Sequence, residues 1–177
     1  FEALGVPVFN ADVETKKFLE VPEVKAQLIA LLGNEILGTE GKLDKSKIAS
    51  IVFKDEKKLL GLNAILHPLA KESFLKWCEQ HKESPYVIKE AAILFESGAW
   101  QEVDKVIAVT CKESTRIKRV VERDNVSAEE VKARIQRQLP DEVRNKKATF
   151  VIENDGEMVL PQVLRIHGEL MILSKKK

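Results

Sequence analysis

Asp12 is the first residue of this sequence whose type and position suggest chemistry. It follows a short apolar run, Gly5–Phe9, that we expect to form a buried strand. In α/β proteins such a strand delivers a charged group to the carboxyl edge of the sheet, where ligands bind. The same aspartate also stands where it can cap a helix that begins at Val13. The pattern leaves both interpretations open, a reacting carboxylate and a helix cap.

Two glutamates accompany a second expected strand. Residues 86–88 begin this strand, which leads through Glu90 to the apolar residues 93–95 and then to Glu96. Either carboxylate could orient a base or hold a magnesium-bound water, since Mg²⁺ takes one or two carboxylates together with phosphate oxygens. Either could equally be a surface charge.

His67 precedes Pro68, where we expect a helix to break. An imidazole at such an end could donate to an anionic ligand or move a proton. The alternative is a structural hydrogen bond at the helix end.

Basic side chains concentrate between residues 116 and 147, which hold ten basic and six acidic residues. Arg119 and Arg123 are four residues apart and share one face of an expected helix. Guanidinium groups suit phosphate oxygens, so this excess points to a phosphate-bearing ligand, with Arg134 nearby in sequence. The alternative is an exposed, salt-bridged pair of helices. Its expected acidic partners are Glu122, Glu129 and Glu130.

The chain between the two acidic strand ends, residues 13–83, is expected to be nearly all helical. This is much longer than a plain βαβ crossover, so it indicates an inserted helical subdomain. The expected elements are a helix from Val13 to Leu19, one from Pro22 that Gly33 ends, two capped by Asp44 and Asp55, and one from Leu69 to His81 after a break at Pro68.

The second half of the chain mixes strands and helices. Residues 106–110 form a β-branched run that suits a parallel sheet buried on both faces, and residues 150–152 form another strand. Expected helices cover about residues 113–123, 127–139 and 159–173, the second starting at a capping box and stopped by Pro140.

Composition describes one ordinary globular chain. Its 177 residues are 44% hydrophobic and 32% charged, and the net charge of +1 gives no reason to expect nucleic acid as a partner. No apolar run is long enough for a membrane span. We interpret Cys78 and Cys111 as reduced thiols of a cytoplasmic protein, because their spacing fits neither a disulfide scaffold nor a zinc site.

An ordered set of short motifs spans almost the whole chain. The motifs are Leu4–Val8 with Ala11-Asp12, Gly41–Asp44, Val52-Phe53, Ile65–Pro68, Pro85–Val87, Leu94–Glu96, Arg119 with Arg123-Asp124, Ala133–Ile135 with Gln138, and Val151–Gly156. In this order they resemble the dephospho-CoA kinase family. The resemblance implies an α/β, three-layer P-loop kinase fold with a parallel sheet, a helical acceptor-binding insertion and a helical lid. It also implies transfer of the ATP γ-phosphate to the 3′-hydroxyl of dephospho-CoA, the last step of coenzyme A biosynthesis.

The resemblance assigns parts of the chain as well. It implies a single kinase domain over residues 1–177, with residues 13–83 as the dephospho-CoA-binding subdomain and residues 113–147 as the lid. ATP and Mg²⁺ are the implied cofactors of a cytoplasmic monomer without nucleic-acid or membrane partners. The implied site residues are Asp12 as catalytic base, His67 and Glu90 at the acceptor, and Arg119, Arg123, Arg134 and Asn154 at ATP and the lid; none is assigned to a metal.

Three departures from the family pattern accompany this resemblance. Asn10 stands where aspartate is usual, and Glu90 and Ala92 stand where aspartate and proline are more usual, which weakens a metal role for Glu90. The sequence as written also lacks the phosphate loop G-x-x-x-x-G-K-[ST], so by itself it is not expected to bind ATP competently. We therefore expect roughly 20 further residues before Phe1. Alternatives are another small-molecule or nucleotide kinase of this fold, and a catalytically dead acceptor-binding module.

Overall fold

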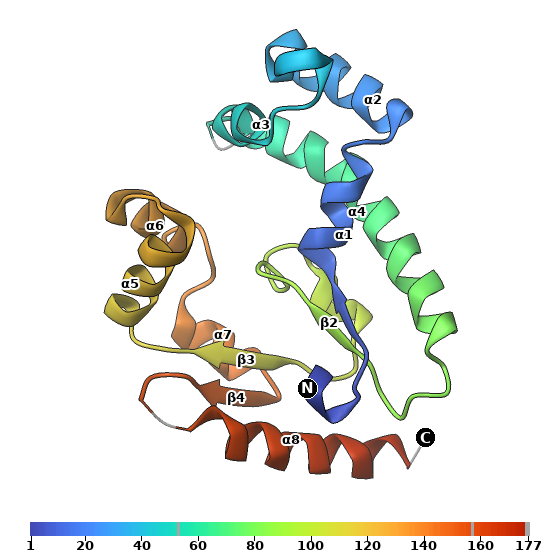
Figure 1. Ribbon diagram of the computed structural model, residues 1–177, viewed down its shortest axis with the longest axis vertical. Helices are drawn as coiled ribbons and strands as arrows, with labels where there is room; N and C mark the ends of the chain where they lie inside the picture. Colours follow the sequence, from blue (N-terminus) through green and yellow to red (C-terminus); the bar gives the residue numbers. More distant parts are fainter. Residues whose placement is uncertain (53, 157, 176–177) are drawn as a thin grey trace. The chain divides into compact units, whose positions relative to one another are not determined.

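The computed structural model describes residues 1–52, 54–156 and 158–175. Two compact parts divide the chain: an N-terminal part, Glu2–Ala91, and a C-terminal part that begins at Ala92 and includes Phe1. Each part has its own parallel strand pair and its own helices (Figure 1). Phe53, from one of the family motifs, lies outside the described residues.

The strand pair of the N-terminal part is short and parallel. Strand β1 (Val8–Asn10) pairs with β2 (Ile88–Glu90), so that Val8 faces Ile88 and Asn10 faces Glu90. Both strands therefore end at the same edge, with their terminal polar residues side by side.

The expected continuation of the second strand through residues 93–95 is wrong. Strand β2 ends at Glu90, and the apolar run that follows is folded into turns. Local hydrogen bonds close these turns: Ser97 N donates to the carbonyl of Ile93, and Gly98 N to that of Phe95. Gly98 has φ 79°, a conformation that glycine adopts without strain and that ends any extended path.

The helices of the N-terminal part follow the capping residues of the sequence. Asp44 Oδ1 accepts from the backbone N–H groups of Ser46 and Lys47, and Asp55 caps the longest helix in the same way. Gly33 ends one helix with φ 95°. The elements are 3₁₀ turns at Glu2–Leu4, Asn34–Ile36 and Thr39–Gly41 and helices α1 (Ala11–Phe18), α2 (Pro22–Leu32), α3 (Lys45–Val52) and α4 (Glu56–Gln80).

Helix α4 runs without interruption through Pro68, so the expected break at this proline is wrong (Figure 1). Proline lacks the N–H that would donate to the carbonyl of Ala64, and its ring disfavours a helix interior. Packing outweighs this cost because the helix buries Leu66 before the proline and Phe74 after it, while Pro68 itself is exposed. One helix therefore contributes packing residues at both ends of the N-terminal part.

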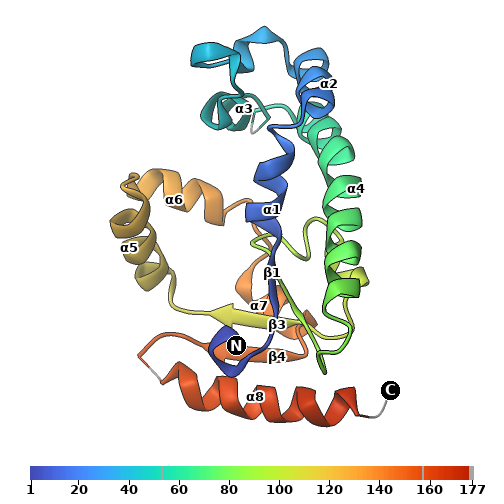
Figure 2. The same ribbon diagram turned by 45° about the vertical axis from the view of Figure 1, so that its right-hand side comes forward.

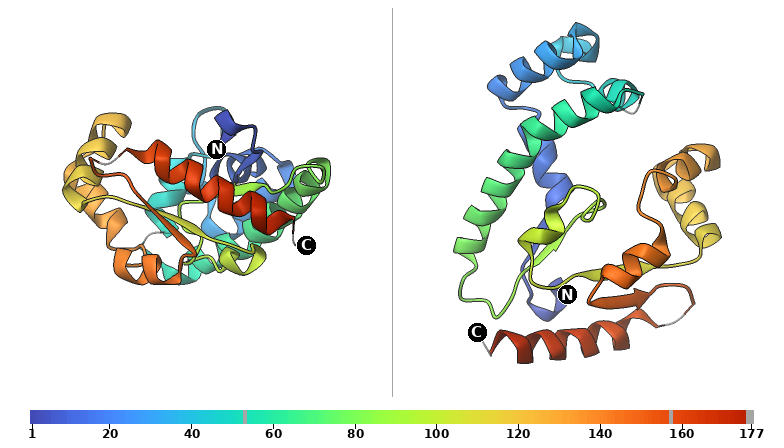
Figure 3. Two further views of the ribbon diagram at one scale, coloured as in Figure 1. Left: turned by 90° about the horizontal axis from the view of Figure 1, so that it is seen from below. Right: turned by 180° about the vertical axis from the view of Figure 1, so that it is seen from behind.

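The main core of the N-terminal part joins α2, α3 and α4 (Figure 3, right). Leu28 and Ile36 are completely buried in it. A second cluster near the other end of α4 holds strand β1: the Phe9 ring lies 5.2 Å from that of Phe74 and 5.4 Å from that of Trp77, centroid to centroid. Aromatic contacts of this kind fix the strand pair against the helix.

The C-terminal part contains a parallel strand pair, in agreement with the expected parallel sheet. Strand β3 (Ile107–Thr110) pairs with β4 (Phe150–Glu153), with Thr110 opposite Glu153. Helix α8 (Val159–Ser174) runs alongside β4 in Figures 1 and 2, and Gln162 ties the two by hydrogen bonds in both directions with the backbone of Glu153. The remaining elements are the 3₁₀ helix Ala99–Glu102, α5 (Glu113–Asp124), α6 (Ala128–Ile135) and α7 (Asp141–Lys147).

Two details of this part differ from expectation. Burial of β3 on both faces is wrong, because Ala108 is 5% exposed whereas Val109, which points to the opposite face, is 56% exposed. Helix α6 ends at Ile135 rather than near Leu139. Pro140 disfavours helical backbone at the residue before it, and Leu139 N donates instead to Glu96 Oε1 at 2.6 Å.

Among the described residues, no helix combines the length and the apolar character needed to cross a bilayer.

Candidate active site

The carboxyl edge of β1 and β2 brings together Asn10, Asp12 and Glu90, which we call the acidic edge. Asn10 and Glu90 are the last residues of the paired strands, and Asp12 is the second residue of α1, which starts directly after β1. The expected position of Asp12 at a sheet edge thus matches the geometry, whereas Glu90, expected inside a longer strand, reaches the same edge because β2 ends there. This is the edge at which α/β enzymes bind ligands.

The cap of α1 is Asn10, so the interpretation of Asp12 as a helix cap is wrong. Asn10 has extended backbone, and its Oδ1 accepts from the backbone N–H of Val13 at 2.9 Å. An N-cap side chain reaches the N–H two or three residues ahead, and Asn10 occupies that position. Asp12 lies inside the first turn, exposed to solvent at the positive end of the helix dipole.

Glu90 is held by the same asparagine. Its Oε2 accepts from Asn10 Nδ2 at 2.6 Å. Although Glu90 has a large exposed surface, partial burial of its carboxylate raises its pKa, and the negative charge of Asp12 raises it further. Two carboxylates that influence each other at a strand edge can align a hydroxyl group and accept its proton.

His67 is exposed in the middle of α4 and not at a helix end, so that part of the prediction is wrong. Leu66 beside it belongs to the main helical core, whereas the acidic edge is anchored near Phe74 and Trp77. The contacts described for the acidic edge do not include His67.

Two of the predicted ATP and lid residues meet directly in the C-terminal part. Arg119 Nη1 on α5 donates to the backbone carbonyl of Asn154, just after β4, at 2.9 Å. Asn154 N in turn donates to the carbonyl of Thr110 at the end of β3. The contact therefore places the Arg119 guanidinium at the carboxyl edge of β3 and β4.

The other two predicted arginines share one carboxylate. Arg123 binds Asp124 through two hydrogen bonds, of 2.7 and 3.0 Å, and Arg134 Nη1 of α6 lies 3.8 Å from the same side chain. The Arg123 hydrogen bond is the main cause of a lowered pKa at Asp124. The acidic partner of both arginines is Asp124, which was not among the expected partners Glu122, Glu129 and Glu130. The Glu130 side chain instead forms the capping box with Ser127. Two guanidinium groups on one carboxylate leave a net positive charge.

A third charged cluster was not predicted as a site. Arg116 of α5 donates to Asp141 Oδ2, Arg144 Nη2 lies 2.9 Å from Asp141 Oδ1, and Thr110 also donates to this carboxylate. Burial acts to raise the pKa of Asp141, but the Arg116 hydrogen bond and the two positive charges lower it overall. Arg116 and Thr110 lie 25 and 31 residues before Asp141 in the sequence, so only the local i,i+3 pair of Asp141 with Arg144 on α7 could have pointed to this cluster.

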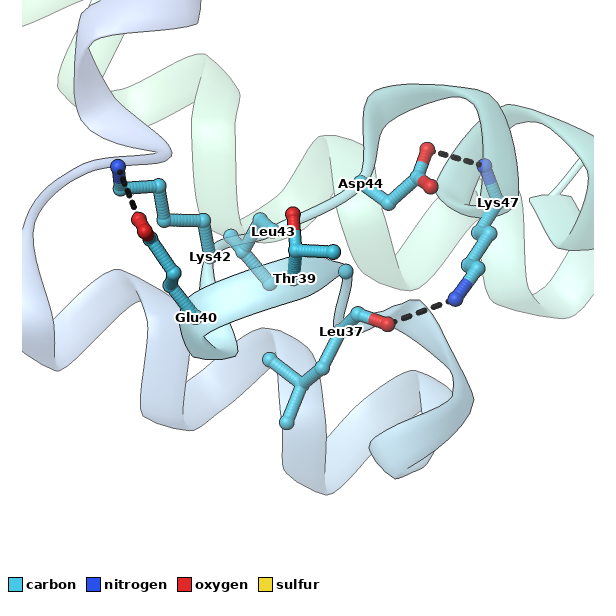
Figure 4. Close-up of a pocket in the computed structure, with 8 residues that line it drawn as sticks. Leu37, Thr39, Glu40, Lys42, Leu43, Asp44 and Lys47 are labelled. Atoms are coloured by element: carbon cyan, nitrogen blue, oxygen red, sulfur yellow. Dashed lines mark hydrogen bonds and ion pairs between the residues drawn. The ribbon is translucent and has the colours of Figure 1, made fainter.

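A pocket of about 670 Å³ lies among residues 37–47, within the segment expected to bind the acceptor (Figure 4). Its charged groups are engaged with one another and with the backbone: Lys42 pairs with Glu40 at 2.9 Å, and Lys47 Nζ donates to the carbonyl of Leu37 at 2.7 Å. None of the predicted site residues lines it.

The described residues hold no group of three or more His, Cys, Asp or Glu side chains arranged to bind a metal ion. Mg²⁺ does not need such a cage, because nucleotide phosphates and water supply most of its ligands.

Comparison with known proteins identifies the relatives of this chain. The family model described as CoaE, dephospho-CoA kinase, matches residues 1–159. The dephospho-CoA kinase of Bacteroides fragilis strain YCH46 is 40% identical over 168 residues, covering 93% of this chain and 81% of the relative. That of Bacillus anthracis is 37% identical over 162 residues, covering 90% and 81%.

Solved structures agree with the sequence relatives. TT1252 from Thermus thermophilus matches with a TM-score of 0.82 and 30% identity over 97% of this chain and 86% of its own. Dephospho-CoA kinase from Campylobacter jejuni matches with a TM-score of 0.67 and 25% identity over 96% and 87%. These matches confirm the expected α/β fold of the P-loop kinase type, and with the family model they establish that this chain belongs to the dephospho-CoA kinase family.

Proposed function

We propose that the protein phosphorylates the 3′-hydroxyl of dephospho-CoA with ATP and so completes coenzyme A biosynthesis. The observation that carries this proposal is the match of the dephospho-CoA kinase model to residues 1–159. The acidic edge supports it chemically, since a hydroxyl acceptor needs a carboxylate that orients it and takes its proton.

Asp12 is the catalytic base in this proposal. The acceptor oxygen attacks the γ-phosphorus, the bond from that phosphorus to the oxygen of the leaving ADP breaks, and the hydroxyl proton passes to Asp12. Its exposed position in the first turn of α1 supports the role, because the carboxylate is not used as a helix cap. Glu90, at the end of the neighbouring strand, helps to hold the acceptor.

Residues 13–83 act as the acceptor-binding subdomain, and residues 113–147 act as the lid. His67 contacts the acceptor in this proposal, since its side chain is exposed on α4 within the first of these segments. The net positive charge of the Arg123–Asp124–Arg134 cluster, and Arg119 beside Asn154, suit the ATP phosphates. Both compact parts together form one kinase domain.

Mg²⁺ enters with the nucleotide, as the MgATP complex, and none of the described side chains is assigned to it. The protein acts as a monomer in the cytoplasm. The free thiols of Cys78 and Cys111 support a reducing compartment. Light scattering during gel filtration tests the monomer, and localisation of a tagged full-length protein tests the compartment.

A substrate panel tests the proposed function. Full-length protein is mixed with MgATP and dephospho-CoA, nucleoside monophosphates or other small alcohols, and ADP release is followed together with the mass of the product. We expect turnover with dephospho-CoA and a phosphorylated product identical to coenzyme A. Preference for a nucleoside monophosphate, or turnover with none of the acceptors, would overturn the proposal.

A further inference from the structure

Asn10 connects three pieces of the acidic edge at once. Its backbone ends β1 opposite Glu90 of β2. Its Oδ1 accepts from Val13 N and so caps α1, the helix that carries Asp12. Its Nδ2 donates to Glu90 Oε2 at 2.6 Å. One side chain thus links the helix of Asp12 to the carboxylate of Glu90.

The orientation of the Asn10 amide follows from these partners. A backbone N–H can only donate, so the carbonyl oxygen of the amide must face Val13, and its NH₂ group must face Glu90. Asparagine supplies an acceptor and a donor from one short side chain. Aspartate in the same place keeps the cap but loses the donor.

We propose that Asn10 is a positioning residue: it holds the Glu90 carboxylate beside Asp12, so that the two carboxylates can orient the acceptor hydroxyl and take up its proton. This inference rests on the proposed function. Asn10 acts through Glu90 and through the start of α1, and it does not exchange a proton with the substrate.

The charges around Glu90 explain why an amide suits position 10. Strand β1 and helix α1 pack against β2, and the groups they present to Glu90 are the Asn10 amide and the Asp12 carboxylate. Lys89, next to it in β2, places its ammonium over the Phe74 ring, 4.5 Å from the centroid. A carboxylate at position 10 would add a third negative charge at this edge, which would raise the pKa of Glu90 further.

Asn10→Asp tests the donor while preserving the cap. In the full-length enzyme we expect the melting temperature to stay close to wild type, since aspartate caps about as well as asparagine. We expect kcat with dephospho-CoA to fall about tenfold, the scale of one charge-assisted hydrogen bond, while the KM for MgATP is unchanged. The acidic limb of the pH profile of kcat should move upward by about one unit.

A double-mutant cycle with Glu90→Gln decides whether Asn10 acts through Glu90. If it does, adding Asn10→Asp to Glu90→Gln should cost no further turnover, because the carboxylate to be positioned is already gone. Glu169→Gln, the reverse exchange of a carboxylate for an amide, is the control: Glu169 is exposed on α8, pairs with Arg165 and lies outside the proposed acceptor-binding and lid segments, so kcat and the pH profile should stay as in wild type.

Three outcomes would overturn the inference: Asn10→Asp within a factor of about two of wild-type kcat, an unmoved pH profile, or losses that simply multiply in the double variant. These are distinct from failure of the proposed function, in which wild-type enzyme itself does not turn over dephospho-CoA; the inference would then fall with it.

Discussion

Asp12 lies in the first turn of α1, a helix that Asn10 caps, so its chemical contribution can be separated from a structural one. We predict that Asp12→Asn lowers turnover by about 10²- to 10⁴-fold, or roughly 3 to 5.5 kcal/mol of barrier, because an amide cannot accept the acceptor's proton. The melting temperature should hardly change, since Asn10 retains the cap. Steady-state kinetics and a thermal melt on full-length protein check both statements. Turnover within about threefold of wild type would remove Asp12 from the mechanism.

Asp141 should make stability depend on pH. Its pKa in the folded protein is lowered from the ordinary 3.8, so the ionised carboxylate stabilises the fold at neutral pH, and this contribution is lost as the pH falls through the lowered pKa. We predict that Asp141→Asn reduces the free energy of unfolding by about 1 kcal/mol at pH 7, and that the difference from wild type fades below about pH 4.

Urea unfolding of both proteins at neutral and acidic pH measures this effect. Glu142→Gln, an exposed neighbour on α7, is the control and should leave the unfolding curve unchanged at both pH values. An Asp141→Asn deficit that persists undiminished in acid would show that the cluster stabilises the fold by some means other than its charge.

At the level of single residues, the sequence predicted the place of Asp12 but not the side-chain contacts around it. Asn10 and Asp12 are both good capping residues, and a shift of two positions decides which one caps. The contact between Asn10 and Glu90 spans 80 residues, so no local pattern contains it. The Arg116–Asp141 pair is hidden for the same reason.

Helix α4 offers a prediction at the level of elements. Pro68→Ala should raise the free energy of unfolding by about 1 to 3 kcal/mol, because alanine restores a donor for the carbonyl of Ala64 and suits a helix interior. Pro22→Ala is the matched control and should have little effect, since Pro22 occupies the first position of α2, where no N–H partner is lost. Urea unfolding of the three proteins measures the difference, and equal values for both variants would contradict it.

Helix ends with side-chain caps were predictable because the signal is local. Asp44, Asp55 and the Ser127 capping box all act as their sequence context indicates. Helix α4 was not predicted as one piece, since burial of Leu66 and Phe74 overrides the local preference of Pro68. Residues 93–95 have a strand-like composition. An apolar run of this kind contains no residue that signals a turn, so the turns formed by its backbone hydrogen bonds could not be predicted.

For the whole molecule, the lid proposal predicts a change in hydrogen exchange. Protection of amides in residues 113–139 should increase when full-length protein binds a non-hydrolysable ATP analogue with Mg²⁺, because the arginines of α5 and α6 gain a multivalent anion. Unchanged protection across this segment would count against a lid. Arg119→Ala and Arg123→Ala should weaken the response while the exchange of α2 and α3 stays as in wild type.

The α/β class, the helical insertion and the parallel arrangement of the strands were predictable from the sequence. They follow from hydrophobic periodicity and from the positions of turn and capping residues. Which strands pair was less accessible. Strands β1 and β2 are separated by a long helical segment. The sequence predicts the length of this segment but not its course in space, and that course determines whether the two strands meet.

That pairing has a consequence for the order of folding. Strands β1 and β2 have three residues each, and Asn10 and Glu90 are 80 positions apart. Closing a flexible loop of this length costs about 4 kcal/mol of chain entropy plus a constant, which so short a ladder cannot offset. The helices between them must therefore form and pack first, shortening the effective loop. The edge that carries Asp12 should close last during folding and open first under denaturant, while the core around Leu28 is still intact.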